Sequence, residues 1–219
     1  MKFRINLLLF FILVIFIVPV FSQSSTNNKI NNDKKYFVSD LQKSIDILHY
    51  NLLLDLNIEE KILSGTAKLT AAKNLELDLD SRPELELNLY DNLTISSIKV
   101  NGTNAEFSRN KNRIFIKPAE DLVDTFEIEI VYSGTPKRSG FDGFVFGEVN
   151  GQSLVYNISE PIYAPTWFPC DDDPSDKAML DIEITNDSQF VSVSNGNLID
   201  IKKNGAKKTY HYKTEYPIS

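Results

Sequence analysis

The sequence predicts an all-β fold, an antiparallel β-sandwich or a saddle-like set of sheets, on three observations. Apolar and polar residues alternate at every second position in several short segments, which is the period of strands with one buried face. Asparagine-glycine pairs such as Asn101-Gly102, Asn150-Gly151 and Asn204-Gly205 lie between these segments and suit tight turns. No segment sustains the apolar period of an amphipathic helix.

The first expected strand follows Ser44 and buries one of its faces. Its apolar face comprises Leu48, Tyr50, Leu52, Leu54 and Leu56. Its polar face comprises His49, Asn51, Asp55 and Asn57. The alternation recurs in residues 75–79, 85–89, 126–130 and 180–184. We expect a last hairpin, in which Asn204-Gly205 joins residues 199–202 to residues 209–213. Many short strands with frequent turns favour a single β-domain.

The first 22 residues have the features of a secretory signal peptide. Lys2 and Arg4 precede an unbroken apolar run over residues 7–18, and residues 20–22 offer positions for cleavage. The run is shorter than the roughly 20 residues of a spanning helix, so we expect no stable membrane anchor. We therefore predict a signal peptide at 1–22, a flexible Ser-, Asn- and Lys-rich leader at 23–43 and a β-domain at 44–219. The protein should be exported to the periplasm or the extracellular space.

Composition and charge exclude several classes of protein. The chain has 219 residues, of which 42% are hydrophobic and 24% charged, with a net charge of −7. This balance fits a globular protein and argues against a nucleic-acid partner, which needs clustered basic residues. A single cysteine, Cys170, excludes a disulfide framework within the chain and a cysteine-based metal site. The only histidines, His49 and His211, are far apart in sequence, and we expect no metal at either.

Residues 160–174 depart from the strand pattern. They contain four prolines, the only tryptophan and the only cysteine. Proline restricts the backbone, so such a loop can present side chains at a fixed place. The structural alternative is that Trp167 and Phe168 close the end of the sandwich while the aspartates at 171–173 cap turns. A turn is favoured over a calcium site at these aspartates, because calcium needs six to eight oxygen ligands.

This segment resembles the N-terminal β-domain of the aminopeptidase N family of zinc metallopeptidases (peptidase family M1, of the gluzincin type). The residues that match the family pattern in order are Glu160, Pro161, Phe168, Pro169, Cys170, Asp172, Pro174, Lys177 and Ala178. Upstream, residues 90–102 and 132–134 are similar to further landmarks of the family, so the resemblance runs from about residue 46 to residue 219. Two positions depart from the pattern, Ile158 where the family often has Gln and Asp173 where it usually has Glu.

The resemblance implies that Glu160 binds the free α-amine of a peptide substrate. The α-amino group has a pKa of about 7.7–8.0, so it is mostly an ammonium ion at neutral pH and pairs with a carboxylate. An exposed pair is worth only about 0–1 kcal/mol, so a second domain must close over it. Cys170 lies beside aspartates, which disfavours the thiolate, so we expect a buried structural thiol and no nucleophile.

The zinc of the family is bound by an H-E-x-x-H helix, where the glutamate activates water. This chain contains no such motif, so zinc is expected in a separate catalytic domain, and the chain alone should be inactive. The sequence thus predicts the N-terminal domain of an exported aminopeptidase, whose partners are the catalytic domain and peptides with a free N-terminus.

Two alternatives come from the class of binding proteins. One is a stand-alone secreted β-sandwich module without catalysis, which should present a polar surface where a catalytic domain would dock. A large exposed apolar patch around Tyr163, Trp167 and Phe168 would instead favour a partner domain. The other is a carbohydrate-binding sandwich in which Trp167 and Tyr163 stack on sugars.

Overall fold

The computed structural model describes residues 38–74, 84–138 and 143–219. Within these ranges the chain forms three β-sheets and two short 3₁₀ helices, η1 (Gln42–Ser44) and η2 (Ala164–Thr166). None of the helices in these ranges is long and apolar enough to cross a membrane. The predicted signal peptide and the expected strand at 75–79 lie outside the described residues.

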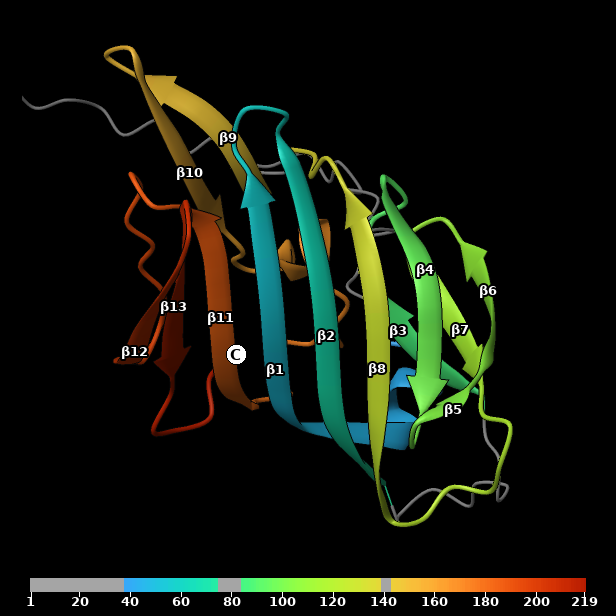
Figure 1. The fold of residues 1–219 in the computed structure, drawn as a ribbon. Helices are drawn as coiled ribbons and strands as arrows, with labels where there is room; N and C mark the ends of the chain where they lie inside the picture. The colour runs from blue at the N-terminus through green and yellow to red at the C-terminus, as the bar shows by residue number, and fades with distance from the viewer. Residues whose placement is uncertain (1–37, 75–83, 139–142) are drawn as a thin grey trace, which may run out of the picture. The chain divides into compact units, whose positions relative to one another are not determined.

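The largest sheet has eight strands in the order β12-β13-β11-β1-β2-β8-β4-β5 and faces the viewer in Figure 1. Its strands are β1 (Ile45–Asn57), β2 (Ile62–Lys73), β4 (Leu93–Val100), β5 (Thr103–Asn104), β8 (Thr125–Gly134), β11 (Met179–Asp187), β12 (Asn197–Asn204) and β13 (Lys207–Lys213). Neighbouring strands are antiparallel except β1 and β11, which are parallel. Strands β1 and β11 belong to distant parts of the chain, so this pairing ties the two ends of the domain together.

Two smaller sheets complete the domain. One has the order β3-β7-β6, with β3 (Leu85–Asn88), β7 (Arg113–Lys117) and β6 (Glu106–Asn110), and it lies behind the large sheet in Figure 1. The other is a two-stranded ribbon of β9 (Gly143–Val149) and β10 (Gln152–Ile158), which reaches the upper left of that view. The turn of the ribbon is Asn150-Gly151, and both residues have positive φ, as the sequence predicts for a tight hairpin.

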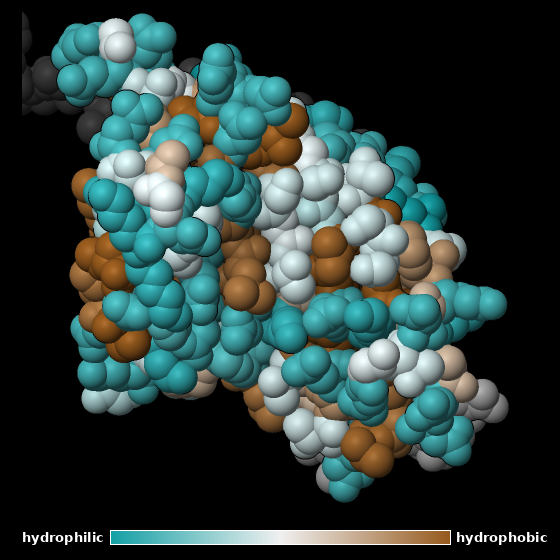
Figure 2. Space-filling view, viewed as in Figure 1, coloured by the Kyte–Doolittle hydropathy of each residue, from teal (hydrophilic) through white to brown (hydrophobic). Residues whose placement is uncertain are grey.

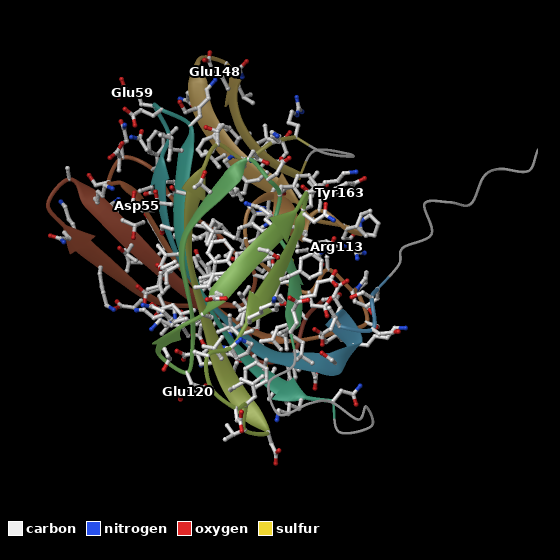
Figure 3. All side chains as sticks on the ribbon, turned by 90° about the vertical axis from the view of Figure 1, so that its right-hand side faces the viewer. Asp55, Glu59, Arg113, Glu120, Glu148 and Tyr163 are labelled. Atoms are coloured by element: carbon white, nitrogen blue, oxygen red, sulfur yellow. The ribbon has the colours of Figure 1, made fainter. Side chains whose placement is uncertain are left out.

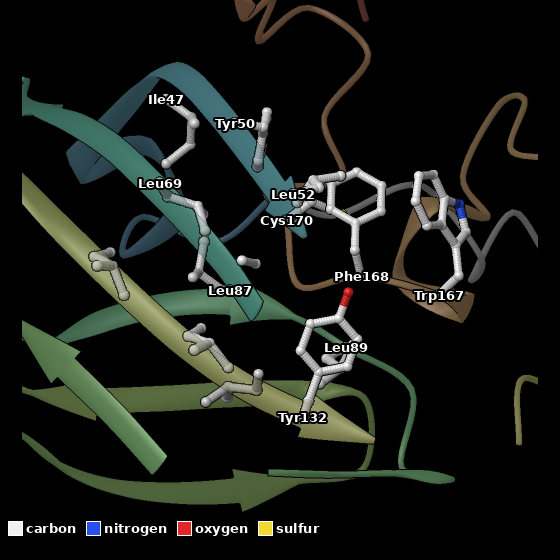
Figure 4. Packing of buried hydrophobic residues seen from close by; sticks show 14 of the residues in the cluster. Ile47, Tyr50, Leu52, Leu69, Leu87, Leu89, Tyr132, Trp167, Phe168 and Cys170 are labelled. Carbon is white, nitrogen blue, oxygen red and sulfur yellow. The ribbon is translucent and has the colours of Figure 1, made fainter. Parts of the chain in front are cut away.

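The hydrophobic core is built from the inner face of the large sheet and from the three-stranded sheet. Leu52 and Leu69 of the large sheet and Leu87 and Ile116 of the smaller one are fully buried in one cluster. Figure 4 shows part of this cluster at close range. Each such side chain contributes about 1.5–3 kcal/mol through burial. The all-β fold class is therefore confirmed, and the core is enclosed between sheets as a sandwich requires.

The predicted strand pattern needs one correction, at the start of β1. Leu48 is 41% exposed and not buried with the later leucines of the strand. The pairing with β2 shifts register between Ile47 and His49, so one extra residue reverses the faces of the strand upstream of it. Ile45 and Ile47 are consequently buried in place of Leu48. The remaining predicted segments match β3, β8 and β11, and residues 199–202 and 209–213 form the hairpin of β12 and β13.

A close contact between β2 and β8 depends on a glycine. Gly65 is directly opposite Tyr132 in the register of the two strands, and the fully buried ring of Tyr132 lies across it. A Cβ atom at position 65 would be 2.5 Å from the hydroxyl oxygen of Tyr132 and 2.7 Å from Cε1 of the ring. Only glycine leaves room for the ring to cover its neighbour strand.

Candidate functional site

The segment after β10 carries the residues that the sequence singled out. The chain leaves β10 at Ile158, turns through residues 160–163 and continues through η2 into a buried stretch over 165–170. Glu160 is exposed at this turn. Among the described residues, no hydrogen bond or ion pair engages its carboxylate. Figure 3 shows Tyr163, from the same turn, on the opposite side of the large sheet from Asp55.

Hydrogen bonds hold the turn that presents Glu160. The amide of Tyr163 donates to the carbonyl of Ser159 at 2.8 Å, and the hydroxyl of Thr166 donates to the carbonyl of Tyr163 at 2.6 Å. The indole Nε1 of Trp167 donates to the hydroxyl of Ser159 at 3.0 Å. The residue immediately before Glu160 is thus fixed on both its backbone and its side chain. Sequence reasoning did not identify Ser159 or its bond to Trp167, because only folding brings the two together.

Aromatic contacts anchor this turn in the core. Trp167 lies 4.3 Å from Phe168 and 6.0 Å from Phe144 of the ribbon, measured between ring centroids. Phe168 meets Tyr50 of β1 edge to face at 5.4 Å; Figure 4 labels Tyr50, Trp167 and Phe168. Such pairs add about 0.5–1.5 kcal/mol each beyond burial. Trp167 and Phe168 therefore have the structural role that the sequence offered as an alternative, since they fill the space between β1, the ribbon and the loop.

Burial of Trp167 affects two expectations about the surface. Only 8% of Trp167 and 9% of Phe168 are exposed, so neither ring contributes much to an apolar surface, and Trp167 offers no face on which a sugar could stack. Exposed apolar side chains occur instead on the neighbouring ribbon, at Val149, Leu154 and Ile158. A hollow of about 450 Å³ is lined by both ribbon strands and by Lys61 of the β1–β2 turn.

The segment 170–176 is joined to β3 and η1. Cys170 and Asn88 exchange two backbone hydrogen bonds, at 2.8 and 3.0 Å. Asp171 accepts a hydrogen bond from the side chain of Gln42 at 3.1 Å. Burial, with the nearby charge of Asp173, raises the pKa of Asp171 to about 7. Burial, with a hydrogen bond to Asp46, likewise raises the pKa of Asp176 to about 7.

Cys170 and the acidic turn after it have well-defined surroundings. Cys170 is buried, and burial first, then the charges of the neighbouring aspartates, raise the pKa of its thiol well above the usual value. Asp173 caps a turn, because its carboxylate accepts hydrogen bonds from the amide and the hydroxyl of Ser175 at 2.9 and 2.8 Å. Of the other motif residues, Pro169 is buried, Asp172 is half-buried, and Pro161, Pro174 and Lys177 are exposed.

The two histidines meet on the outer face of the large sheet. Nε2 of His49 lies 2.9 Å and Nε2 of His211 lies 2.8 Å from the carboxylate of Asp181. The ammonium group of Lys213 donates to the same carboxylate at 2.9 Å. Burial raises the pKa of Asp181, but these hydrogen bonds outweigh it and the pKa is lowered. The described residues include no group of three or more His, Cys, Asp or Glu that could hold a metal ion.

Comparison with known proteins identifies the family to which the all-β domain and its motif segment are similar. The family model "Peptidase M1 N-terminal domain" matches residues 47–219. The chain is 26% identical to "Probable aminopeptidase 2" of Sulfurisphaera tokodaii over 165 residues, which is 75% of this chain and 20% of the relative. It is 27% identical to "Aminopeptidase N" of Lactobacillus helveticus over 172 residues, 76% of this chain and 19% of that protein.

Solved structures show the same fold. The M1 zinc metallopeptidase of Deinococcus radiodurans superposes with a TM-score of 0.66 at 25% identity, covering 80% of this chain and 40% of that one. The chain spans about a fifth of the length of the two curated relatives. Together with the family match over residues 47–219, these likenesses confirm the resemblance drawn from the 160–178 motif. The chain belongs to the peptidase M1 N-terminal domain family.

Proposed function

We propose that this chain is the N-terminal domain of an exported zinc aminopeptidase, and that Glu160 anchors the free α-amine of the peptide substrate. The main support is the family match over residues 47–219. The matched range includes Glu160 and its motif, and the relatives that align with it are named aminopeptidases. The position of Glu160 supports it further. The carboxylate is exposed on a turn that Ser159 and Trp167 hold in place.

The physical properties of Glu160 suit an amine anchor. An exposed carboxylate without a partner among the described residues is free to accept hydrogen bonds from an ammonium ion. A charge-assisted bond of this kind is about twice as strong as a neutral one once water is excluded. In the isolated domain water has free access, so the contact contributes only about 0–1 kcal/mol. Glu160 therefore needs a second surface that closes over it.

The catalytic domain would supply that surface and the zinc. The residues of this chain fit a zinc ion poorly, because the two histidines share Asp181 with the ammonium group of Lys213. That ammonium group already supplies the positive charge that a metal would bring. Val149, Leu154 and Ile158 on the ribbon next to Glu160 are exposed apolar side chains. We infer that the catalytic domain docks on this ribbon and covers them.

Export is the second part of the proposal. It rests on the basic start and apolar run of residues 1–22, which are typical of a cleaved signal peptide. Recovery of the native polypeptide with an antibody against residues 44–219, followed by intact mass measurement, tests the whole assignment. A heavier zinc-containing polypeptide without residues 1–22 is expected. A metal-free species near the mass of residues 23–219 would instead indicate the stand-alone module.

The role of Glu160 is tested by Glu160→Gln in that native polypeptide. The substitution keeps the shape and removes the charge, so kcat/KM for peptides with a free N-terminus should fall roughly 10- to 100-fold, as for loss of a hydrogen bond to a charged group. Glu59→Gln is the matched control, since Glu59 is an exposed carboxylate in the β1–β2 turn. An unchanged kcat/KM in the Glu160 variant would refute the anchoring role.

A further inference from the structure

Strand β12 forms an unprotected edge of the large sheet. It pairs with β13 on one side, and among the described residues no strand pairs with its other side. Three of its apolar side chains are well exposed, Leu198 at 48%, Ile199 at 55% and Ile201 at 48%. Figure 2 shows brown, hydrophobic surface at the left-hand side, where Figure 1 places β12. An exposed edge with apolar side chains is a template for pairing with another chain.

The sequence of this edge is complementary to itself. When two copies of a strand pair antiparallel about a two-fold axis perpendicular to the sheet, the residue on the axis faces itself and its neighbours face each other crosswise. With Ile201 on the axis, Asp200 faces Lys202 of the second copy, and Lys202 faces the other Asp200. Two opposite-charge pairs then flank an isoleucine pair.

Other registers lack this complementarity. An axis on Asp200 places two carboxylates opposite each other, and an axis on Lys202 or Lys203 does the same with two ammonium groups. An axis on Ile199 brings Asp200 opposite Leu198 and pairs no charges. Like charges directly opposite each other destabilise a pair of strands. Only an axis on Ile201 places both Asp200 and Lys202 opposite a side chain of opposite charge. Without such pairs, the register of an exposed edge strand is weakly specified.

The local geometry fits this register. Ile201 is opposite the buried Tyr210, whereas Lys202 is opposite Thr209, so Ile201 and Lys202 point to opposite faces of the sheet. Asp200 and Lys202 already lie on one face, with 3.9 Å between their charged atoms. The amide of Ile201 donates to the carboxylate of Asp200 at 2.7 Å. Pairing would replace that local bond by a backbone bond between the two Ile201 residues and free Asp200 for the second copy's Lys202.

We propose that β12 is a homodimerisation edge, at which a second copy of this chain pairs antiparallel about Ile201 and continues the large sheet. A single pair of strands buries less than the roughly 1,200 Å² of a stable interface. The dimer is therefore reversible, with a dissociation constant in the micromolar range or weaker. The ribbon and the Glu160 turn belong to other strands of the domain, so this surface is separate from the proposed substrate site.

A charge exchange tests the register. In sedimentation velocity on the full chain at physiological salt, Asp200→Lys and Lys202→Asp should each weaken self-association at least about tenfold, because each puts like charges opposite each other. The double variant Asp200→Lys with Lys202→Asp restores both pairs, and its dissociation constant should return to within about threefold of the original. Lys111→Asp, at an exposed position in the β6–β7 turn outside the large sheet, is the control for a change of net charge alone. A wild-type chain that stays monomeric at about 1 mM, or a double variant as weak as the single ones, would overturn the proposal.

A cross-link tests the axis independently. Cα atoms of a directly opposed hydrogen-bonded pair are about 5.5 Å apart, within the range for a disulfide. Ile201→Cys should therefore form a covalent dimer under mild oxidation, whereas Leu198→Cys, which faces Asn204 of the second copy, should not. The native Cys170 is buried and does not interfere. Equal cross-linking at both positions would indicate non-specific contact and refute the register.

Discussion

The contact between Gly65 and Tyr132 predicts a large effect from the smallest possible substitution. In Gly65→Ala the new methyl carbon would overlap Cζ of Tyr132 and would lie 2.5 Å from its hydroxyl oxygen and 2.7 Å from Cε1. Carbon atoms make favourable contacts only near 3.5–4.0 Å, so the ring must move by roughly 1 Å. Tyr132 is only 1% exposed, which leaves the ring no solvent to move into. Overpacking of this kind costs about 1–3 kcal/mol.

Chemical denaturation of the full chain measures this cost directly. Gly65→Ala should lower the free energy of unfolding by about 1–3 kcal/mol, and Tm by about 2–4 °C per kcal/mol for a domain of this size. Tyr132→Phe is the matched variant, because the buried hydroxyl of Tyr132 has no hydrogen-bond partner among the residues that the structure describes. Its removal should leave stability unchanged or raise it, and in the double variant it should relieve part of the cost of the added methyl group. A Gly65→Ala chain as stable as the original would refute the packing argument.

Two further predictions concern the loop. Asp171 and Asp176 keep a pKa of about 7 in the fold, against about 4 when unfolded, so the native state binds more protons between these values. The free energy of unfolding should therefore fall as pH rises from about 4 to about 7. Asp171→Asn should make this dependence on pH less steep, as measured by denaturation at a series of pH values. An unchanged dependence would contradict the raised pKa of Asp171. Trp167→Phe removes the donor to Ser159. In the proposed full-length aminopeptidase it should raise KM for peptides with a free N-terminus about fivefold. Ser159→Thr retains the acceptor and should leave KM unchanged, and steady-state kinetics separates the two variants.

The fold class followed from the sequence because it depends on local pattern. Alternation in β8 and β11 and asparagine-glycine turns such as Asn150-Gly151 are short-range signals, and the structure reproduces them. The exposure of Leu48 could not be predicted, because it follows from one extra residue in the pairing of β1 with β2. The apolar positions change phase between Ile47 and Leu48, but the pairing with the partner strand decides which of the two side chains is buried.

The sequence located the motif segment, but it did not show which residues surround that segment. The order of Glu160, Pro169 and Cys170 identifies the segment, but the partners that hold it lie elsewhere in the chain. The contacts of Asp181 were likewise not predictable from the sequence. Its carboxylate contacts His49 and His211, which lie on the two strands that flank β11. Spacing in the sequence placed the two histidines far apart. The sheet brings them to one carboxylate because β1 and β13 both border β11.

Rigidity and exposure at Glu160 have different consequences for binding. The turn is fixed by Ser159 and Trp167, so little backbone conformational entropy remains to be lost when a ligand binds. Exposure works against this advantage, because water competes for the carboxylate and screens its charge. Ile158, which is 44% exposed, ends β10 only two residues before Glu160. A surface that buries Ile158 and the ribbon must also approach Glu160, so docking would exclude water from the proposed amine site in the same step.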